Sequence, residues 1–258
     1  RSSAGIAAAG SEKMTKGFGP LLPGFVHLKW NDHDAIKAAI SDKTAAIMIE
    51  PIQGEGGIRP VPEQCLKGLR DLCDEHGLLL IFDEVQCGVG RTGKLFAHEW
   101  AAIDPDIMMV AKGIGGGFPL GAVLAKEDAA FGMTTGTHGS TYGGNPLGCA
   151  VGNKVVELVG DAEFLNEVAE KAAFFKAGLE DLVGRHPNTF KSVRGKGLMM
   201  GLECAVPNMD FVNAGYDALI LTVPAGDNVV RFVPALTITK EEIDEALARL
   251  SSAAQSLG

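Results

Sequence analysis

The sequence predicts an α/β fold with a mostly parallel sheet, followed by a smaller α+β domain. Short apolar runs of strand length alternate with helical or loop segments. These runs are apolar along their whole length, which is typical of parallel strands that are covered on both faces. The pattern changes near residue 146, beyond which long amphipathic helices dominate. We therefore expect a large domain over residues 1–146, and a linking helix with a small domain over residues 147–258.

The first half contains four expected strands and one clear helix. The strands cover residues 44–50, 78–82, 106–111 and 121–125, and a glycine-punctuated loop follows the first of them. The helix covers residues 61–77, where Leu66, Leu69, Leu72 and Cys73 fall on one face. Gly77 suits the end of this helix, because glycine adopts the left-handed conformation of a C-terminal cap at no steric cost.

In the second half, we expect helices over residues 147–159 and 162–183 and strands over 197–203 and 228–233. A last helix begins with a capping box, in which Thr239 and Glu242 each bind a backbone N–H of the other.

Composition excludes several classes of function. The chain has 258 residues and a formal net charge of −9, which argues against a nucleic-acid-binding surface. Its longest aliphatic runs are far shorter than the roughly 20 residues of a membrane span. The five cysteines are widely spaced and odd in number, so we expect free thiols in a reducing compartment, the cytoplasm, and no metal site.

The segment "IFDEVQCGVGRTGK", residues 81–94, matches two nucleotide-binding patterns in its glycines. Both patterns fail in context. Five residues separate the strand from the first glycine, Leu95 replaces the magnesium-binding serine or threonine, and no acidic residue follows at the distance that a dinucleotide ribose requires. We interpret the glycines as a turn-rich connection, and a nucleotide-binding protein remains the weakest alternative.

Asp83 and Lys112 each end an apolar strand, and ligands bind at the carboxyl ends of parallel strands. Pyridoxal phosphate chemistry needs this pair of residues. A lysine forms a Schiff base with the cofactor, and a carboxylate keeps the pyridine nitrogen protonated. On spacing alone, the alternative that Asp83 and Lys112 form a plain salt bridge, or are separate surface groups, stays open.

Five motifs then appear in order: "IEPIQGEGG", "FDEVQCGVGRTGK", "AKGIGGGFPLGA", "HGSTYGGNPLGCA" and "GDNVVRFVPAL". Together they resemble the class III pyridoxal-phosphate-dependent aminotransferases, over nearly the whole chain. The resemblance implies fold type I and a homodimer with shared active sites, with neither nucleic acid nor a membrane as partner.

The resemblance assigns Lys112 as the Schiff-base lysine and proton shuttle, and Asp83 as the ligand of the pyridine nitrogen. It places Gln86 at the phenolic oxygen, so that Glu84 and Val85 of the same motif also belong to the cofactor site. The remaining assignments cover the phosphate and the substrate. Thr141 binds the phosphate of the neighbouring subunit, Ser140 lies near the substrate, and Glu55 acts as a gate on the substrate-binding Arg231.

The chain departs from the family at its front. Family members carry a glycine-rich phosphate loop and an aromatic-x-G-R-[ST] motif, and this chain begins at what resembles the arginine of that motif. The resemblance then assigns Arg1 to a substrate carboxylate. The first residues also lack the pattern of a signal peptide, so we expect a chain that begins inside a domain.

Within the family, the resemblance implies transfer of an amino group from N-acetylornithine to 2-oxoglutarate. Ornithine, succinylornithine and 4-aminobutyrate remain alternative amino donors, because the same core residues serve them all. A truncated, inactive remnant is an alternative from a different class of function.

Overall fold

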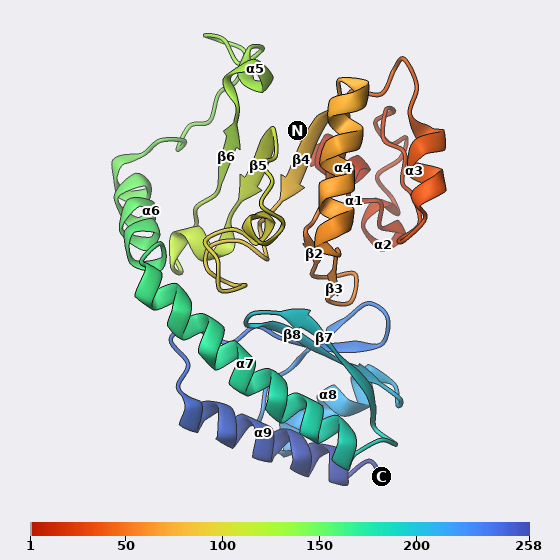
Figure 1. The fold of residues 1–258 in the computed structure, drawn as a ribbon, viewed down its shortest axis with the longest axis vertical. Helices are drawn as coiled ribbons and strands as arrows, with labels where there is room; N and C mark the ends of the chain where they lie inside the picture. The colour runs from red at the N-terminus through yellow and green to blue at the C-terminus, as the bar shows by residue number, and fades with distance from the viewer. Residues whose placement is uncertain (1) are drawn as a thin grey trace. The chain divides into compact units, whose positions relative to one another are not determined.

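The computed structural model describes residues 2–258, and Figure 1 shows its helices and strands. The chain divides into two compact units, with the boundary in the sequence between Ala45 and Ala46. We describe each unit by itself. The predicted domain boundary at 146/147 does not coincide with this division and stays a prediction.

The first unit contains three short helices, α1 (Ser2–Ala9), α2 (Glu12–Thr15) and α3 (His33–Ala39). The Asp32 side chain caps α3 by accepting a hydrogen bond from the backbone N–H of Ala35 at 2.9 Å. Only Ala7 is buried among the described residues of this unit. The unit therefore has almost no core of its own.

The second unit begins with a four-stranded sheet in the order β1-β4-β5-β6. Strands β1 (Ala46–Ile49), β4 (Leu79–Asp83) and β5 (Ile107–Val110) are parallel, which confirms the mostly parallel sheet. Helix α4 (Glu63–His76) buries Leu66, Leu69 and Cys73, and Gly77 ends it in the left-handed conformation, as the sequence predicts.

Strand β6 (Ala122–Ala125) differs from the expectation of a strand covered on both faces. It pairs antiparallel with β5, and all four of its residues are exposed, with Val123 retaining 69% of its accessible surface. The reason is its position, since β6 is the edge strand of the sheet among the described residues. An apolar run predicts a strand, but it does not reveal what covers that strand.

Short elements connect the strands of this sheet. A hairpin of β2 (Ile52–Gln53) and β3 (Arg59–Pro60) follows β1. The 3-10 helices η1 (Ala97–Ala101) and η2 (Lys112–Gly115) follow β4 and β5, and the short helix α5 (Glu127–Ala130) follows β6.

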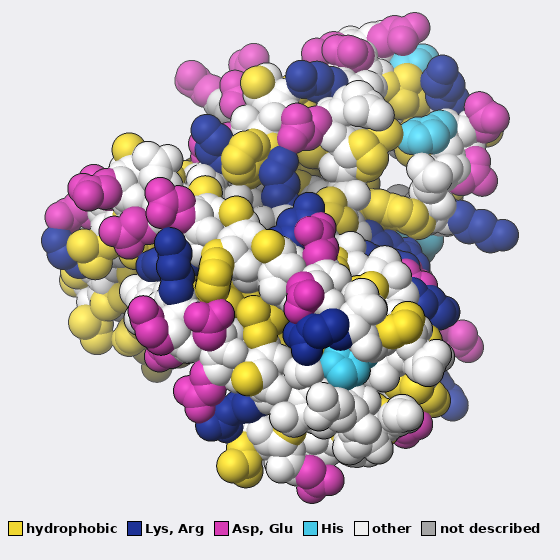
Figure 2. All heavy atoms as spheres, turned by 60° about the horizontal axis from the view of Figure 1, so that its bottom comes forward, with side chains coloured by type: hydrophobic (Ala, Val, Ile, Leu, Met, Phe, Trp, Pro, Cys, Tyr) yellow, Lys and Arg dark blue, Asp and Glu magenta, His cyan; other side chains and the backbone are white. Residues whose placement is uncertain are grey.

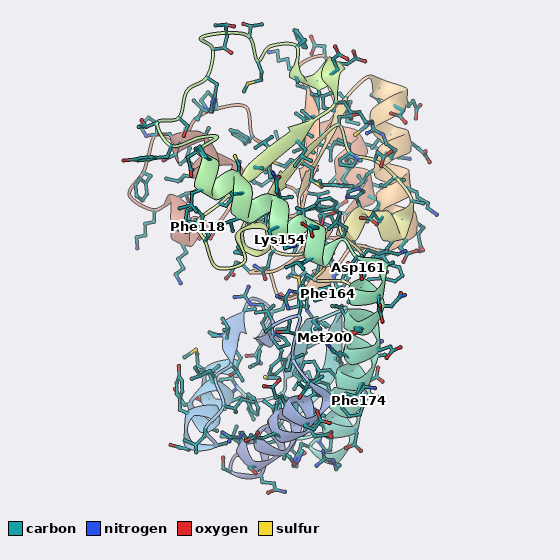
Figure 3. The ribbon with its side chains drawn as sticks, turned by 90° about the vertical axis from the view of Figure 1, so that its left-hand side faces the viewer. Phe118, Lys154, Asp161, Phe164, Phe174 and Met200 are labelled. Carbon is teal, nitrogen blue, oxygen red and sulfur yellow. The ribbon has the colours of Figure 1, made fainter. Side chains whose placement is uncertain are left out.

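Two consecutive helices then lead to the second sheet. These are α6 (Pro146–Val159) and α7 (Ala162–Arg185), and Asp161 caps α7 at the junction between them (Figure 3). Helix α7 buries Val168, Ala172, Phe175, Leu179 and Leu182, the helical repeat expected from the sequence.

The second sheet is antiparallel, in the order β7-β8-β10-β9. Its strands are β7 (Phe190–Lys196), β8 (Met199–Cys204), β9 (Val223–Ala225) and β10 (Val229–Phe232), and helices α8 (Asn208–Asp217) and α9 (Lys240–Gln255) complete this part of the unit. The predicted capping box of Thr239 and Glu242 starts α9. Apolar side chains of α7, α8, α9 and this sheet form one core, which confirms a small α+β arrangement.

The surface fits the acidic composition. Acidic and basic side chains are interspersed on the face in Figure 2, and they form no continuous basic area there. None of the helices in the described residues is both long and apolar enough to cross a membrane.

Candidate active site

The carboxyl ends of the parallel strands gather three ionisable residues. Glu50 directly follows β1, Asp83 ends β4, and Lys112 lies two residues beyond β5. The register pairs Ile49 with Phe82, so Glu50 and Asp83 are neighbours across the two strands. Burial raises the pKa of Glu50, the nearby Asp83 raises it further, and Lys112 lowers it.

Lys112 is held in an unusual backbone conformation. Its φ of 47° is in the left-handed region, which costs free energy for a residue with a side chain and is common at functional sites. Its amine influences the pKa of both Glu50 and Glu55, yet it has no hydrogen-bond or ion-pair partner among the described residues. The amine is therefore available for chemistry.

The two acidic residues at the end of β4, Asp83 and Glu84, have different environments. One carboxylate oxygen of Asp83 accepts a hydrogen bond from the backbone N–H of Val85 at 2.9 Å, and the other oxygen has no partner in the described part of the chain. Glu84 is fully buried. Its carboxylate accepts bonds from the backbone N–H of Ala97 at 2.8 Å and from the backbone and ring nitrogens of His98 at 2.9 Å.

The positions of Glu84 and Val85 bear on their predicted contact with the cofactor. The Glu84 carboxylate is buried and already accepts hydrogen bonds from the backbone at the start of η1. Val85 contributes a backbone N–H to Asp83. Both residues thus orient the loop, and a direct contact with the cofactor stays a prediction.

A second cluster joins three predicted residues from distant parts of the sequence. One guanidinium nitrogen of Arg231, on β10, donates hydrogen bonds to Glu55 at 2.6 Å and to Gln86 at 2.9 Å. Arg231 has 9% of its surface accessible to solvent, whereas the Glu55 side chain has 78%. The ion pair with Arg231 lowers the pKa of Glu55, so the carboxylate stays charged.

Arg231 has further binding capacity. Its Nε atom is buried and has no hydrogen-bond partner, which is unfavourable for a guanidinium. An incoming carboxylate that displaced the exposed Glu55 side chain would bind the Nη1 atom that Glu55 releases. The arrangement is therefore suited to exchange one carboxylate for another.

The backbone that carries Glu55 is held by a hydrogen bond and by close packing against the turn that contains Gly226. The backbone N–H of Gly226 donates to the Glu55 carbonyl at 2.8 Å, and Arg59 forms an ion pair with Asp227 in the same turn. Gly57 has a φ of 112°, and a Cβ there would lie 2.7 Å from the Gly226 carbonyl oxygen. Glycine is required at this close approach.

Three predicted site residues do not belong to this cluster. Two of them lie elsewhere in the structure, and the third is not among the described residues. Ser140 and Thr141 are exposed in the segment between α5 and α6, where the Ser140 hydroxyl accepts a bond from Gly143 at 3.1 Å. Neither contacts Lys112, Asp83 or Arg231, and their contacts with a neighbouring subunit stay predictions. Arg1 lies outside the described residues.

The glycine loop after β4 cannot serve as a phosphate loop. The backbone N–H groups of Gly88, Gly90 and Gly93 already donate to the carbonyls of Glu84, Leu95 and Gly90. Phosphate binding requires such groups to point at the ligand. The loop is thus a packed connection, in agreement with the interpretation of its sequence context.

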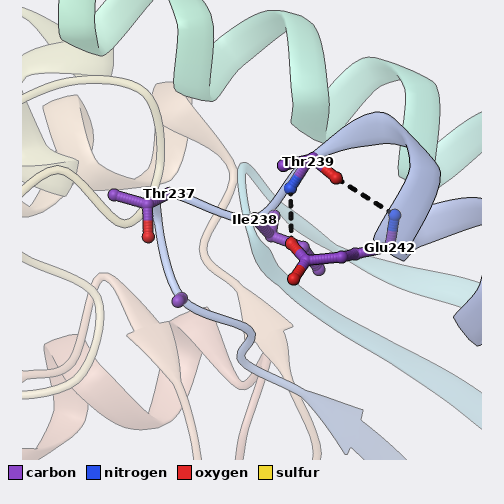
Figure 4. A pocket seen from close by; sticks show the side chains of 5 residues that line it. Thr237, Ile238, Thr239 and Glu242 are labelled. Carbon is purple, nitrogen blue, oxygen red and sulfur yellow. Dashed lines mark hydrogen bonds between the residues drawn. The ribbon is translucent and has the colours of Figure 1, made fainter.

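A separate pocket of about 440 Å³ lies between β10 and α9 (Figure 4). Thr239 and Glu242 line it, but their polar groups bind each other in the capping box. The pocket contains none of the predicted site residues.

Sequence reasoning missed Glu50. Its signal was the same as that of Asp83, a carboxylate directly after a buried strand. The family motif in the hairpin that follows indicates Glu55 instead, and only the strand register places Glu50 beside Asp83.

Known proteins resemble the chain over its whole length. The model of the family "Aminotransferase class-III" matches residues 1–254. Acetylornithine aminotransferase of Rhodobacter capsulatus is 67% identical over 257 residues, which cover 100% of this chain and 65% of that protein. The chain thus spans just under two thirds of the length of this relative.

Solved structures agree with the sequence comparison. A structure of Toxoplasma gondii ornithine aminotransferase has a TM-score of 0.89 at 34% identity, covering 96% of this chain and 60% of that one. N-acetylornithine aminotransferase of Stenotrophomonas maltophilia has a TM-score of 0.82 at 37% identity, covering 90% and 62%. The five motifs, the strand-end residues and these matches agree, and the chain belongs to the class III aminotransferase family.

Proposed function

We propose that the complete protein is a pyridoxal-phosphate-dependent aminotransferase that moves the amino group of N-acetylornithine to 2-oxoglutarate, in arginine biosynthesis. The observation that carries this proposal is the gathering of two functional parts at one edge of the first sheet. Asp83 and Lys112 provide the groups for a cofactor, and Arg231 with Glu55 provides an exchangeable carboxylate site.

The described residues fit pyridoxal phosphate. Among the described residues the Lys112 amine is unpaired and can attach to an aldehyde, and one oxygen of Asp83 is free to accept a hydrogen bond from a protonated ring nitrogen. The structure of Toxoplasma gondii ornithine aminotransferase contains this cofactor at partial occupancy in its active site. When bound, the cofactor supplies an electron-accepting ring that stabilises negative charge on the substrate Cα.

The protein's own residues perform the remaining work. The Asp83 carboxylate keeps the ring nitrogen protonated, and its bond from Val85 holds it in place. Lys112 Nζ would take the proton from the substrate Cα and deliver it to the neighbouring carbon of the cofactor. Gln86 lies within reach of Arg231 and so links the cofactor end of the site to its carboxylate end.

The carboxylate site explains how one pocket serves two substrates. While Glu55 covers Arg231, the site presents less positive charge, which suits the side chain of the amino donor. When the Glu55 side chain swings away, Arg231 is free to bind a carboxylate of 2-oxoglutarate. This exchange needs no movement of the backbone.

The donor assignment is supported by the names and identities of the relatives. The relative with 67% identity is an acetylornithine aminotransferase, whereas the ornithine enzyme is 34% identical. Ornithine is the second candidate donor, because a structure of that enzyme has the higher TM-score of the two structures compared above.

Two further features belong to the proposal. A homodimer would bring the exposed Thr141 of one subunit to the cofactor phosphate of the other, which suits its separation from Lys112. A cytoplasmic location is supported by the five cysteines, all of which are free thiols.

The test compares initial rates of the full-length protein with N-acetylornithine, ornithine and 4-aminobutyrate as donors and 2-oxoglutarate as acceptor. We expect the highest kcat/KM with N-acetylornithine and no activity above background in Lys112→Ala. A preference for ornithine would overturn the donor assignment alone. Absence of transamination with every donor would overturn the proposed function.

A further inference from the structure

Arg91, in the middle of the glycine loop, is a cation that has no carboxylate partner in the described part of the chain. The segment around it is packed, since Val89 and Thr92 are buried. Desolvation lowers the pKa of Arg91 to about 10, and no carboxylate pairs with its guanidinium among the described residues. Placing an unpaired charge in such surroundings costs free energy, so the position calls for an explanation.

The contacts of Arg91 all lead to the second sheet. Its guanidinium Nη1 donates to the carbonyl of Leu198 at 3.2 Å and to that of Pro234 at 2.5 Å. Its own carbonyl accepts a bond from the backbone N–H of Leu198 at 2.9 Å. Leu198 directly precedes β8, and Pro234 lies two residues beyond β10.

These two anchor points lie at one end of the pair of strands that contains Arg231. In the antiparallel register, Arg231 pairs with Gly201 and Phe232 pairs with Met200, so the start of β8 and the end of β10 lie together. Arg91 therefore holds this end of both strands at once. Pro234 is only three residues from Arg231.

The same loop also carries the groups that Arg231 must meet. Gln86, five residues before Arg91, accepts the hydrogen bond from Arg231 at 2.9 Å, and Asp83 lies three residues further back. The loop thus touches the β10 segment at two points, once at the site and once through Arg91. Two points of contact fix the direction of β10 as well as its distance from the loop.

Tight packing surrounds the contact of Arg91 with Leu198 and Pro234, which we call the Arg91 joint. Gly197 has a φ of 62°, and a Cβ there would lie 2.3 Å from the Cα of Thr92. A Cβ on Gly90 would lie 2.5 Å from a methyl carbon of Val159, at the end of α6. The loop, the β7–β8 turn and the end of α6 therefore meet with no spare room.

We propose that Arg91 is a positioning residue that fixes Arg231 relative to Gln86 and Asp83, and so sets the affinity for the substrate carboxylate. The proposal rests on the proposed function, since Arg231 is the carboxylate site of that activity. Its physical basis is that the planar guanidinium of an arginine donates to two carbonyls in a fixed geometry, whereas lysine has a rotatable ammonium and an apolar side chain has no donor.

The experiment uses the full-length enzyme with Arg91→Met, Arg91→Lys and a matched control, Arg70→Met. Arg70 also joins distant segments, through ion pairs with Asp74 and Asp106, but it lies at the opposite end of the first sheet. Loss of those ion pairs destabilises the fold without touching Arg231.

For Arg91→Met we expect the KM for 2-oxoglutarate to rise by about tenfold or more with kcat within about threefold of wild type. The visible absorption of the bound cofactor stays unchanged, and hydrogen exchange in residues 228–236 becomes faster. We expect a smaller rise in KM for Arg91→Lys. This variant replaces Arg91→Met in the experiment if the methionine variant does not fold. Arg70→Met lowers Tm and leaves KM unchanged.

An unchanged KM in Arg91→Met, with a loss of Tm equal to that of Arg70→Met, would overturn the proposal, because Arg91 would then be a structural residue only. A parallel loss of kcat and cofactor absorption would overturn it too. If the wild-type protein shows neither cofactor absorption nor transamination, the proposed function fails instead. Hydrogen exchange in residues 228–236 still tests the joint in that case.

Discussion

Two glycine-rich loops of the second unit carry predicted site residues, and they differ in how they are held. Residues 83–94 are packed and hydrogen-bonded from within, with Glu84, Val89 and Thr92 buried. Residues 131–145 are almost wholly exposed and include Ser140 and Thr141. The difference lies in one buried carboxylate, since Glu84 binds three N–H groups and so ties the first loop to η1.

The comparison indicates that the first loop is preorganised by a buried carboxylate, whereas the second loop has hydrogen bonds between residues a few positions apart. A site residue on the first loop should therefore be sensitive to changes in its own scaffold. A site residue on the second loop should be indifferent to the stability of the subunit and important only where it meets a ligand.

Asp83→Asn gives the largest expected effect and separates chemistry from scaffold within one loop. Asparagine can still accept the bond from Val85, so the fold is kept, but the negative charge is lost. We expect transamination by the full-length protein to fall by about 10³-fold, a typical loss for one electrostatic group. Urea denaturation should give a free energy of unfolding within about 1 kcal/mol of wild type.

Glu84→Ala, at the next residue, tests the scaffold of the loop and leaves the Asp83 carboxylate in the sequence. It leaves the backbone N–H groups of Ala97 and His98 buried without an acceptor. We expect the free energy of unfolding to fall by about 3–5 kcal/mol, as for other broken buried charge networks. A loss below 1 kcal/mol in urea denaturation would show that Glu84 does not hold the loop.

Glu55→Gln tests the exchangeable carboxylate site. Glutamine binds Arg231 less strongly than glutamate does, so 2-oxoglutarate displaces it more easily. We expect the KM for 2-oxoglutarate to fall by a few-fold, which corresponds to the free energy of about one ion pair with an exposed partner. The measurement is steady-state kinetics on the full-length protein, with Lys191→Gln, a change at an exposed lysine of β7, as control. A higher KM in Glu55→Gln would contradict the gate.

The same site predicts a dependence on pH. The pKa of Glu55 is below its ordinary value of 4.5 because of Arg231. The ion pair therefore contributes fully above that ordinary value, and it is lost as the pH falls through the lowered pKa. Binding of 2-oxoglutarate to wild type and to Glu55→Gln, measured by calorimetry, should converge on this acid side and differ at neutral pH.

Thr141→Ala should have the smallest effect on the subunit itself. Its side chain is exposed and forms no hydrogen bond among the described residues, so we expect a change in the free energy of unfolding within about 0.5 kcal/mol. Cofactor retention during dialysis of the full-length protein should nevertheless decrease. A large loss of stability would remove the contrast between the two loops.

The strands and helices were predictable because their signals are local. The face of α4, its end at Gly77 and the capping box of α9 follow from residues a few positions apart. The exposure of β6 was not predictable in this way, since an apolar run reveals a strand and not its cover.

For the site, strand ends indicated Asp83 and Lys112, and the family motifs indicated Arg231, Glu55 and Gln86. The place of Glu50 required the strand register, and the joint at Arg91 required contacts over more than 100 residues of sequence. Such long-range contacts carry no signal in a single sequence.

The central claim is that Lys112 carries the cofactor chemistry, and an absorption spectrum of the full-length protein with pyridoxal phosphate tests it most directly. We predict a visible band that shifts when an amino donor is added and is absent in Lys112→Ala. The same band in both proteins, unaffected by the donor, would contradict the account.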